Sequence, residues 1–157
     1  MSDLYETDVL AWSENQAALL RVLATGERVN NQIDWANVVE EIESVGRSER
    51  AALASHVRVI LERLAKLHVS PAIGRRAGWR ESIRHARAAV AELLEASPSL
   101  GRTPQELVAR EIARARSPVA GALADHGEET SVALDSVDYE VADVIGTFFL
   151  SDPAPQR

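Results

Sequence analysis

One stretch, residues 34–69, constrains the fold of this chain more than any other. It reads DWANVVEEIESVGRSERAALASHVRVILERLAKLHV, and at about 100° per residue its large apolar side chains fall on one broad face. The phase continues through Gly46, so the pattern predicts one helix, roughly 50 Å long. Because an apolar face of that length is not stable in water alone, neighbouring segments must cover it. The predicted face consists of Trp35, Val38, Val39, Ile42, Val45, Leu53, Val57, Ile60, Leu64 and Leu67.

Turn signals delimit two further helices in the first hundred residues. An apolar stripe predicts a helix over residues 4–24, for which Ser2 or Asp3 provides the N-cap. Pro71 ends the long helix, since the residue before a proline avoids helical geometry, and the next helix is predicted over residues 78–96. The stripe of the first helix consists of Tyr5, Val9, Trp12, Leu19, Leu20 and Leu23.

The C-terminal third begins with the clearest helix start in the chain. Residues 103–106, TPQE, predict a capping box with proline at the first helical position. Pro118 must kink or split this helix, and Gly127 ends it. A short last helix is predicted over residues 139–145, and the apolar run 148–150 is expected to plug one end of the core.

The fold class follows from four amphipathic helices joined by short connections, one of which is a predicted loop over residues 97–101. This organisation predicts an all-α, antiparallel helical bundle with a short C-terminal helix. The length of 157 residues favours one domain over residues 1–150, followed by a frayed tail at 151–157. The chain has no cysteine, no apolar run near the roughly 20 residues that cross a bilayer, and an acidic N-terminus unlike a signal peptide. We therefore expect a cytoplasmic protein that does not enter a membrane.

Several short motifs follow one another in a specific order over residues 3–125. Asp34-Trp35 precedes Glu40-Glu41-Ile42-Glu43 and Gly46-Arg47-Ser48-Glu49. The flanking motifs are Tyr5-Glu6, Asp8, Trp12, Gln16-Ala17, Trp79, Ser82-Ile83, Arg87 and Ser97-Pro98-Ser99-Leu100. In these motifs the chain resembles an uncharacterised bacterial family, catalogued as domain of unknown function 29. The resemblance implies an all-helical fold and implies no activity, substrate or cofactor.

Charge is distributed unevenly along the chain. The net charge of −7 argues against general nucleic-acid binding, which needs clustered lysines and arginines. Residues 1–50 carry 4 basic and 10 acidic side chains, residues 51–100 carry 8 and 4, and residues 101–157 carry 5 and 10. The first interpretation is that a basic helix packs between acidic ones. The alternative is that the basic segment binds an anionic ligand or partner.

The basic segment places four arginines along one side of the helix predicted over residues 78–96. Trp79 is predicted on the opposite, buried face, where it would be a poor stacking platform for nucleic-acid bases. The pattern therefore favours an acidic protein partner, or a second copy of this chain, over nucleic acid. The candidate binding residues are Arg76, Arg80, Arg84 and Arg87.

Polar residues interrupt the apolar face of the long helix. Glu49 and His56 lie two turns apart and, with Trp12, form a candidate polar pocket. One interpretation is a metal or acid/base site, but the chain has neither the Glu-x-x-His of di-metal bundles nor the His-x-x-x-His of zinc helices. The other is that each side chain ends on an ordinary hydrogen bond. Gly46 predicts the close approach of another helix or of a large ring such as that of Trp12.

The sequence contains no nucleophile motif and no phosphate-binding glycine loop. We therefore assign no catalytic residue, no metal ligand and no cofactor. The leading hypothesis is a non-catalytic domain that binds another macromolecule through a charged helix surface. The alternative is an enzyme or sensor with a polar or metal-binding pocket around Glu49 and His56.

Overall fold

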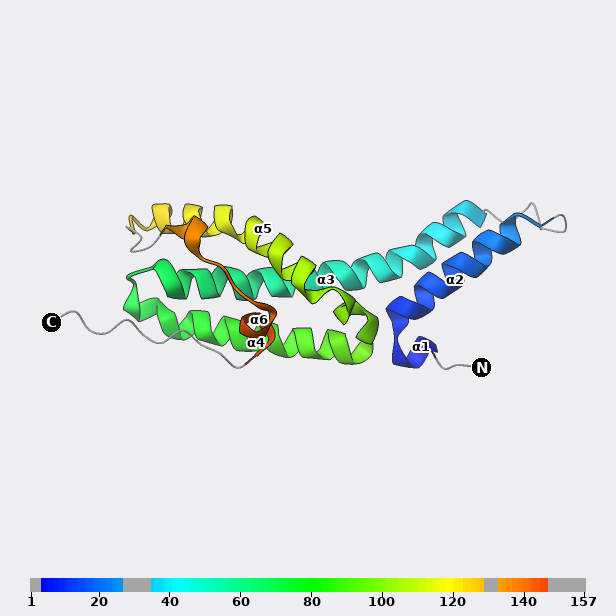
Figure 1. Ribbon diagram of the computed structural model, residues 1–157, viewed down its shortest axis with the longest axis horizontal. Helices are drawn as coiled ribbons and strands as arrows, with labels where there is room; N and C mark the ends of the chain where they lie inside the picture. The colour runs from blue at the N-terminus through cyan, green and yellow to red at the C-terminus, as the bar shows by residue number, and fades with distance from the viewer. Residues whose placement is uncertain (1–3, 27–34, 129–132, 147–157) are drawn as a thin grey trace. The chain divides into compact units, whose positions relative to one another are not determined.

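The structure, a computed structural model, describes residues 4–26, 35–128 and 133–146, which are helical and contain no strand (Figure 1). The predicted all-α class is confirmed. Within these ranges no helix combines the length and the apolarity needed to cross a membrane. The elements are α1 (Leu4–Thr7), α2 (Val9–Ala24), α3 (Trp35–Val69), η1 (Ile73–Arg75), α4 (Arg76–Ala96), η2 (Pro98–Arg102), α5 (Pro104–Asp125), η3 (Leu134–Ser136) and α6 (Val141–Ile145).

The first predicted helix is broken at Asp8, so the prediction of one helix over residues 4–24 is wrong. Asp8 has non-helical backbone angles, and its carboxylate accepts a hydrogen bond from the Ala11 N–H at 2.9 Å. An aspartate in this position satisfies a free donor of the first turn, so it starts a new helix rather than continuing the old one. The predicted caps Ser2 and Asp3 lie outside the described residues.

The long helix is confirmed as α3, which runs without a break from Trp35 to Val69. Gly46 lies where α2 approaches closely, since a Cβ atom there would stand 2.7 Å from Leu10 Cδ1 and 2.8 Å from Ser13 Oγ. The prediction of close approach by another helix is therefore confirmed. The ring of Trp12 is not among the three nearest neighbours, so that alternative is wrong.

The chain divides into two compact units, which we describe separately. The first unit consists of residues 1–53 and 92–102, and the second of residues 54–91 and 103–157. Both α3 and α4 contribute residues to each unit. The expectation of one domain over residues 1–150 stays a prediction.

In the first unit, α2 and the N-terminal half of α3 form an antiparallel hairpin (Figure 1). Its buried apolar side chains are few, namely Leu10, Ala17, Val39 and Leu53. In the C-terminal half of α2 three large apolar side chains are exposed, two of which belong to the predicted stripe, and two valines of the predicted α3 face are also exposed. The exposed side chains are Leu19, Val22, Leu23, Val38 and Val45.

The second unit holds most of the core. The segments of α3, α4 and α5 in this unit run in alternating directions, as predicted for a bundle (Figure 1). Ile60 and Leu64 of α3, Ile83 of α4 and Val119 of α5 are completely buried. Each such side chain stabilises the fold by about 1.5–3 kcal/mol relative to exposure.

The boundaries of the C-terminal elements differ from prediction in detail. Residues 98–102 form the 3-10 helix η2 rather than a loop, and α5 continues through Pro118 without splitting. Thr103 is the N-cap of α5, but its side chain makes no capping hydrogen bond; because Thr103 is exposed, water can satisfy the free donors of the first turn. The last helix, α6, begins at Val141 rather than residue 139. The predicted plug at 148–150 and the tail lie outside the described residues.

Candidate anion-binding site

A pocket of about 510 Å³ lies in the second unit, with walls from α3, η1, α4 and the end of α5. This volume is within the range of small-ligand sites, about 300–1,000 Å³. We call it the basic pocket, after the charge of its lining. It is lined by Arg63, Lys66, Gly74, Arg75, Gly78, Trp79, Ser82, Ala122, Leu123, His126 and Glu128.

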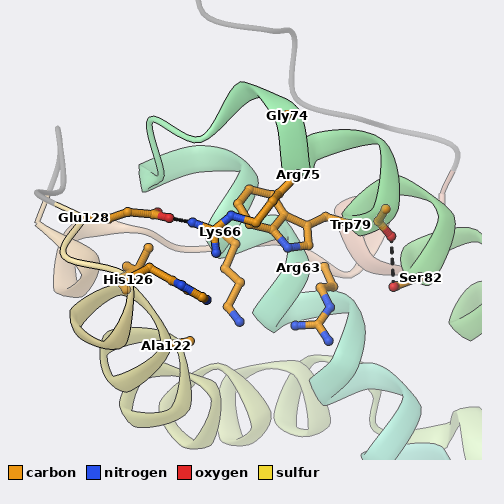
Figure 2. A pocket seen from close by; sticks show the side chains of 11 residues that line it. Arg63, Lys66, Gly74, Arg75, Trp79, Ser82, Ala122, His126 and Glu128 are labelled. Carbon is orange, nitrogen blue, oxygen red and sulfur yellow. Dashed lines mark hydrogen bonds and ion pairs between the residues drawn. The ribbon is translucent and has the colours of Figure 1, made fainter.

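Local structure explains why the basic side chains meet there. Arg63 and Lys66 are three residues apart on α3 and therefore project from the same side of that helix. Pro71 follows the end of α3, and the chain turns back through η1 into α4, which brings Arg75 and Trp79 to the same space. Figure 2 shows these side chains around the pocket, together with His126 and Glu128 beyond the end of α5.

Glu128 is placed by the turn that ends α5. Gly127 has a φ of 62°, which favours glycine, and the Glu128 N–H then donates to the Leu123 carbonyl at 3.0 Å. The Glu128 carboxylate forms an ion pair with Arg75 (Figure 2). It also accepts a hydrogen bond from the Ser70 hydroxyl. Its side chain is only 8% exposed, so this carboxylate is held inside the pocket wall.

The electrostatics of the basic pocket favour an anion. Burial lowers the pKa of Lys66, and the nearby charges of Arg63 and Arg75 lower it further, while Glu62 opposes them. The Nε atom of Arg63 is buried and has no hydrogen-bond partner in the described part of the chain. Among the described residues of the lining, Glu128 is the one acidic side chain, beside Arg63, Lys66, Arg75 and His126. Even with a neutral histidine, positive charge is in excess by two.

Trp79 does not lie on an opposite, buried face as predicted. It is half-buried and lines the basic pocket, with the Arg75 guanidinium 5.6 Å from its ring centroid. The four-residue spacing of Arg75 and Trp79 is the sequence signal for this cation–π contact, because it places both side chains on one side of a helix. The pocket itself, with Arg63 and Lys66, was not predicted because its walls come from segments far apart in the sequence.

The four predicted binding arginines do not form one exposed surface. Arg76 is buried, at 2% exposure, so its assignment to an exposed contact surface needs correction. Arg87 is half-buried and donates to the carbonyl oxygens of Asp143, at 2.6 Å, and Val144, at 2.9 Å. Burial lowers the pKa of Arg87, against the opposing effect of Asp143. Arg84 is exposed and Arg80 partly exposed.

The predicted polar pocket consists of Trp12, Glu49 and His56. Trp12 packs edge to face on Tyr5, with ring centroids 4.9 Å apart. Glu49 and His56 are both partly exposed on α3, the first in the first unit and the second in the second unit. Across the described ranges, no three His, Asp or Glu side chains are grouped so that they could hold a metal ion.

A second pocket, of about 400 Å³, lies between α5 and α6. The hydroxyl of Tyr139, one of its lining residues, is buried without a hydrogen-bond partner in the described part of the chain. Burial raises the pKa of Tyr139, as does the charge of Asp143, so the phenol stays protonated. Because no described residue of its lining is cationic, this pocket is a poorer candidate for an anion.

Comparison with known proteins supports the fold and the family. The chain is similar to the crystal structure of an alpha-helical protein of unknown function from Rhodospirillum rubrum ATCC 11170, with 26% sequence identity and a TM-score of 0.65. That match covers 85% of this chain and 84% of the other. No curated protein matches the chain. A family model described as "Domain of unknown function DUF29" matches residues 4–143, as the motifs predicted. The chain therefore belongs to the DUF29 family.

Proposed function

We propose that this chain is a non-catalytic binding domain whose basic pocket receives an anionic group of a partner protein. The observation that carries the proposal is the excess of cationic side chains in a pocket of about 510 Å³. Charged groups that are withdrawn from water are stabilised by an opposite charge. Among the described lining residues, Glu128 supplies one negative charge for the three cationic side chains. A carboxylate or phosphate from a partner would supply the rest.

The partner surface that fits is acidic. Arg63 and Lys66 bring positive charge to the pocket, and Nε of Arg63 has no hydrogen-bond partner in the described part of the chain. The exposed Arg84 and the partly exposed Arg80 are proposed as further contacts on α4. Residues 1–50 of the chain have a net charge of −6, with 4 basic and 10 acidic side chains, so a second copy also has the required character. We place this binding in the cytoplasm.

The test is calorimetric titration with a peptide of eight glutamates at low and high salt. We expect saturable binding that weakens as salt is added, because partly exposed charges are screened. Arg63→Met combined with Lys66→Met removes both charges and keeps the unbranched stems, so affinity should fall at least about tenfold. Arg47→Met is the matched control, since Arg47 is exposed in the first unit and pairs there with Glu40.

Two results would contradict the proposal. One is the lack of any binding of the peptide at low salt. The other is an unchanged affinity in the double variant with native circular dichroism. Light scattering during the same titration reports whether copies of the chain associate; a dimer that the peptide dissociates would assign the acidic partner to a second copy.

The lowered pKa of Lys66 predicts how anion binding depends on pH. The protonated amine favours an anion, so its contribution is present below the pKa of Lys66 in the folded protein and is lost as the pH rises through that value. This loss should begin below the ordinary lysine pKa of 10.5. Lys66→Arg should remove the dependence, because arginine stays charged. An identical pH profile in both proteins would exclude Lys66 from the site.

A further inference from the structure

Three arginines converge on one fully buried carboxylate in the second unit, and none of the four residues lines the basic pocket. Glu111 of α5 is 0% exposed. Its Oε2 accepts a hydrogen bond from Nε of Arg58 at 2.8 Å and forms an ion pair with Nη2 of the same residue at 2.7 Å. Its Oε1 accepts from Arg110 Nε and Arg114 Nη1, both at 3.0 Å. We call Arg58, Arg110 and Arg114 the arginine triad.

The arginine triad carries more charge than Glu111 can neutralise. One guanidinium would balance one carboxylate, so three leave two positive charges in excess. Nε of Arg110 and Nη1 of Arg114 both donate to Oε1 of Glu111 at 3.0 Å, so these two nitrogens lie close to each other. Like charges this close repel one another, and an additional anion would relieve that repulsion.

The remaining donors of the triad are accessible. The side chains of Arg110 and Arg114 are each 54% exposed, and that of Arg58 is 37% exposed. A guanidinium has five N–H donors. Each arginine of the triad contacts Glu111 through only one or two of its nitrogens. The buried carboxylate thus orients three cationic heads whose unused donors can reach a ligand.

We propose that the arginine triad is a second anion site, which takes a doubly charged phosphate group. A phosphate monoester carries about −1.5 to −2 charges at neutral pH, which matches the excess of two. Its oxygens also match the planar forks of guanidinium groups, which bind phosphate through paired hydrogen bonds. The phosphate can belong to a small ester or to a phosphorylated protein segment, because both present the same group. The inference stands whether or not the basic pocket binds an acidic partner.

The test is an NMR titration with inorganic phosphate at constant ionic strength, with chloride as the balancing ion. We expect saturable shifts of the Nε–H signals of Arg58 and Arg110. Arg114→Gln should weaken phosphate binding at least about tenfold, whereas Arg63→Met with Lys66→Met, which alters the basic pocket, should change it less than about twofold. Affinity should also fall between pH 7.5 and pH 5, because the dianion of inorganic phosphate takes up a proton over this range and loses its second negative charge.

A phosphoserine peptide identifies the source of the phosphate. Tighter binding of this peptide than of free phosphate would assign the site to phosphorylated segments, and equal binding would assign it to small esters; both support the site. Shifts that chloride reproduces, or an unchanged affinity in Arg114→Gln, would mean an adventitious ion only and would overturn the proposal. Arg110→Gln serves as a second variant if Arg114→Gln loses its native circular dichroism.

Discussion

Each of the two units of this molecule holds a buried carboxylate that joins two of its helical elements, Asp8 in the first unit and Glu111 in the second, and the two are stabilised by different kinds of donor. Asp8 in the first unit is held by neutral groups, whereas Glu111 in the second unit is held by cations. Both solutions satisfy a buried charge, which would otherwise be costly. They differ in what they leave at the surface.

Asp8 accepts hydrogen bonds from backbone and hydroxyl donors. The N–H of Ala11 lies 2.9 Å from Oδ1, and Ser99 contributes its N–H at 2.7 Å and its hydroxyl at 2.8 Å. Burial alone would raise the pKa of Asp8, but the hydrogen bonds from Ala11 and Ser99 and the charge of Arg102 lower it overall. These donors connect the start of α2 to η2 and bring no cationic head group to the carboxylate itself.

Glu111 instead collects three guanidinium groups. Burial would raise its pKa, but hydrogen bonds from Arg110 and Arg58 and the charges of Arg58 and Arg114 lower it overall. The comparison teaches that neutral donors give a carboxylate a purely structural role, whereas surplus cations also create a binding surface.

Glu111→Ala should have the largest effect. It removes the charge that holds α3 against α5 and leaves three arginines without their common partner, so we expect a loss of about 3 kcal/mol in the free energy of unfolding. Urea denaturation followed by circular dichroism measures this loss. Glu81→Ala is the control, because Glu81 is exposed on α4 and its replacement should change stability by less than about 0.5 kcal/mol. Equal effects of the two changes would refute the structural role of Glu111.

Asp8→Ala should cost about 2 kcal/mol in the same measurement. The change removes the N-cap of α2, worth about 1 kcal/mol, and leaves the buried N–H of Ser99 without its acceptor. Ser99→Ala keeps that N–H bond and should cost less. In a double-mutant cycle the two losses should not add, because both remove the same contact. Additive losses would show that Asp8 acts only as a cap.

Gly46→Ala should destabilise the first unit by about 1 kcal/mol. Alanine is the better helix former by about 1 kcal/mol, but its Cβ would lie within 2.8 Å of Leu10 and Ser13, whose side chains are buried and would have to shift against their neighbours. The matched control is Gly121→Ala in α5, where a Cβ meets nothing within 4 Å and the propensity term alone should stabilise the chain. Stabilisation by both changes would mean that the α2–α3 contact yields easily.

Acid should destabilise the chain, and the carboxylate variants should lessen that effect. Because the folded pKa values of Asp8 and Glu111 are lowered, their stabilisation is present above the ordinary values of 3.8 and 4.5 and is lost as the pH falls through the folded values. Stability measured from pH 6 downward should therefore decline less steeply in Glu111→Ala than in the parent protein. Parallel curves would mean that Glu111 titrates alike in the folded and unfolded chains.

The extents of the long helices were predictable because they depend on the spacing of apolar, proline and glycine residues along the chain. The periodicity of residues 34–69 predicted α3 through its interior glycine, and the proline and glycine signals placed α5. The first helix was mispredicted because its apolar stripe continues on both sides of Asp8, and the stripe carries no sign of the break there. The role of Asp8 as an N-cap is a local signal, but its bonds to Ser99 join residues 91 apart in the sequence.

What the sequence determined by itself, then, is the all-α class, the long central helix and the family. The tertiary structure alone decided where the charges meet. Arg58 and Glu111 are 53 residues apart, and the basic pocket combines residues of α3 with residues beyond α5. The physical reason is that helix periodicity specifies which side chains share one face, whereas the partner of each face depends on packing between helices. The arginines of α4 therefore form one stripe in the sequence pattern. In the fold Arg76 is buried, Arg87 donates to carbonyl oxygens of α6, and Arg84 is exposed.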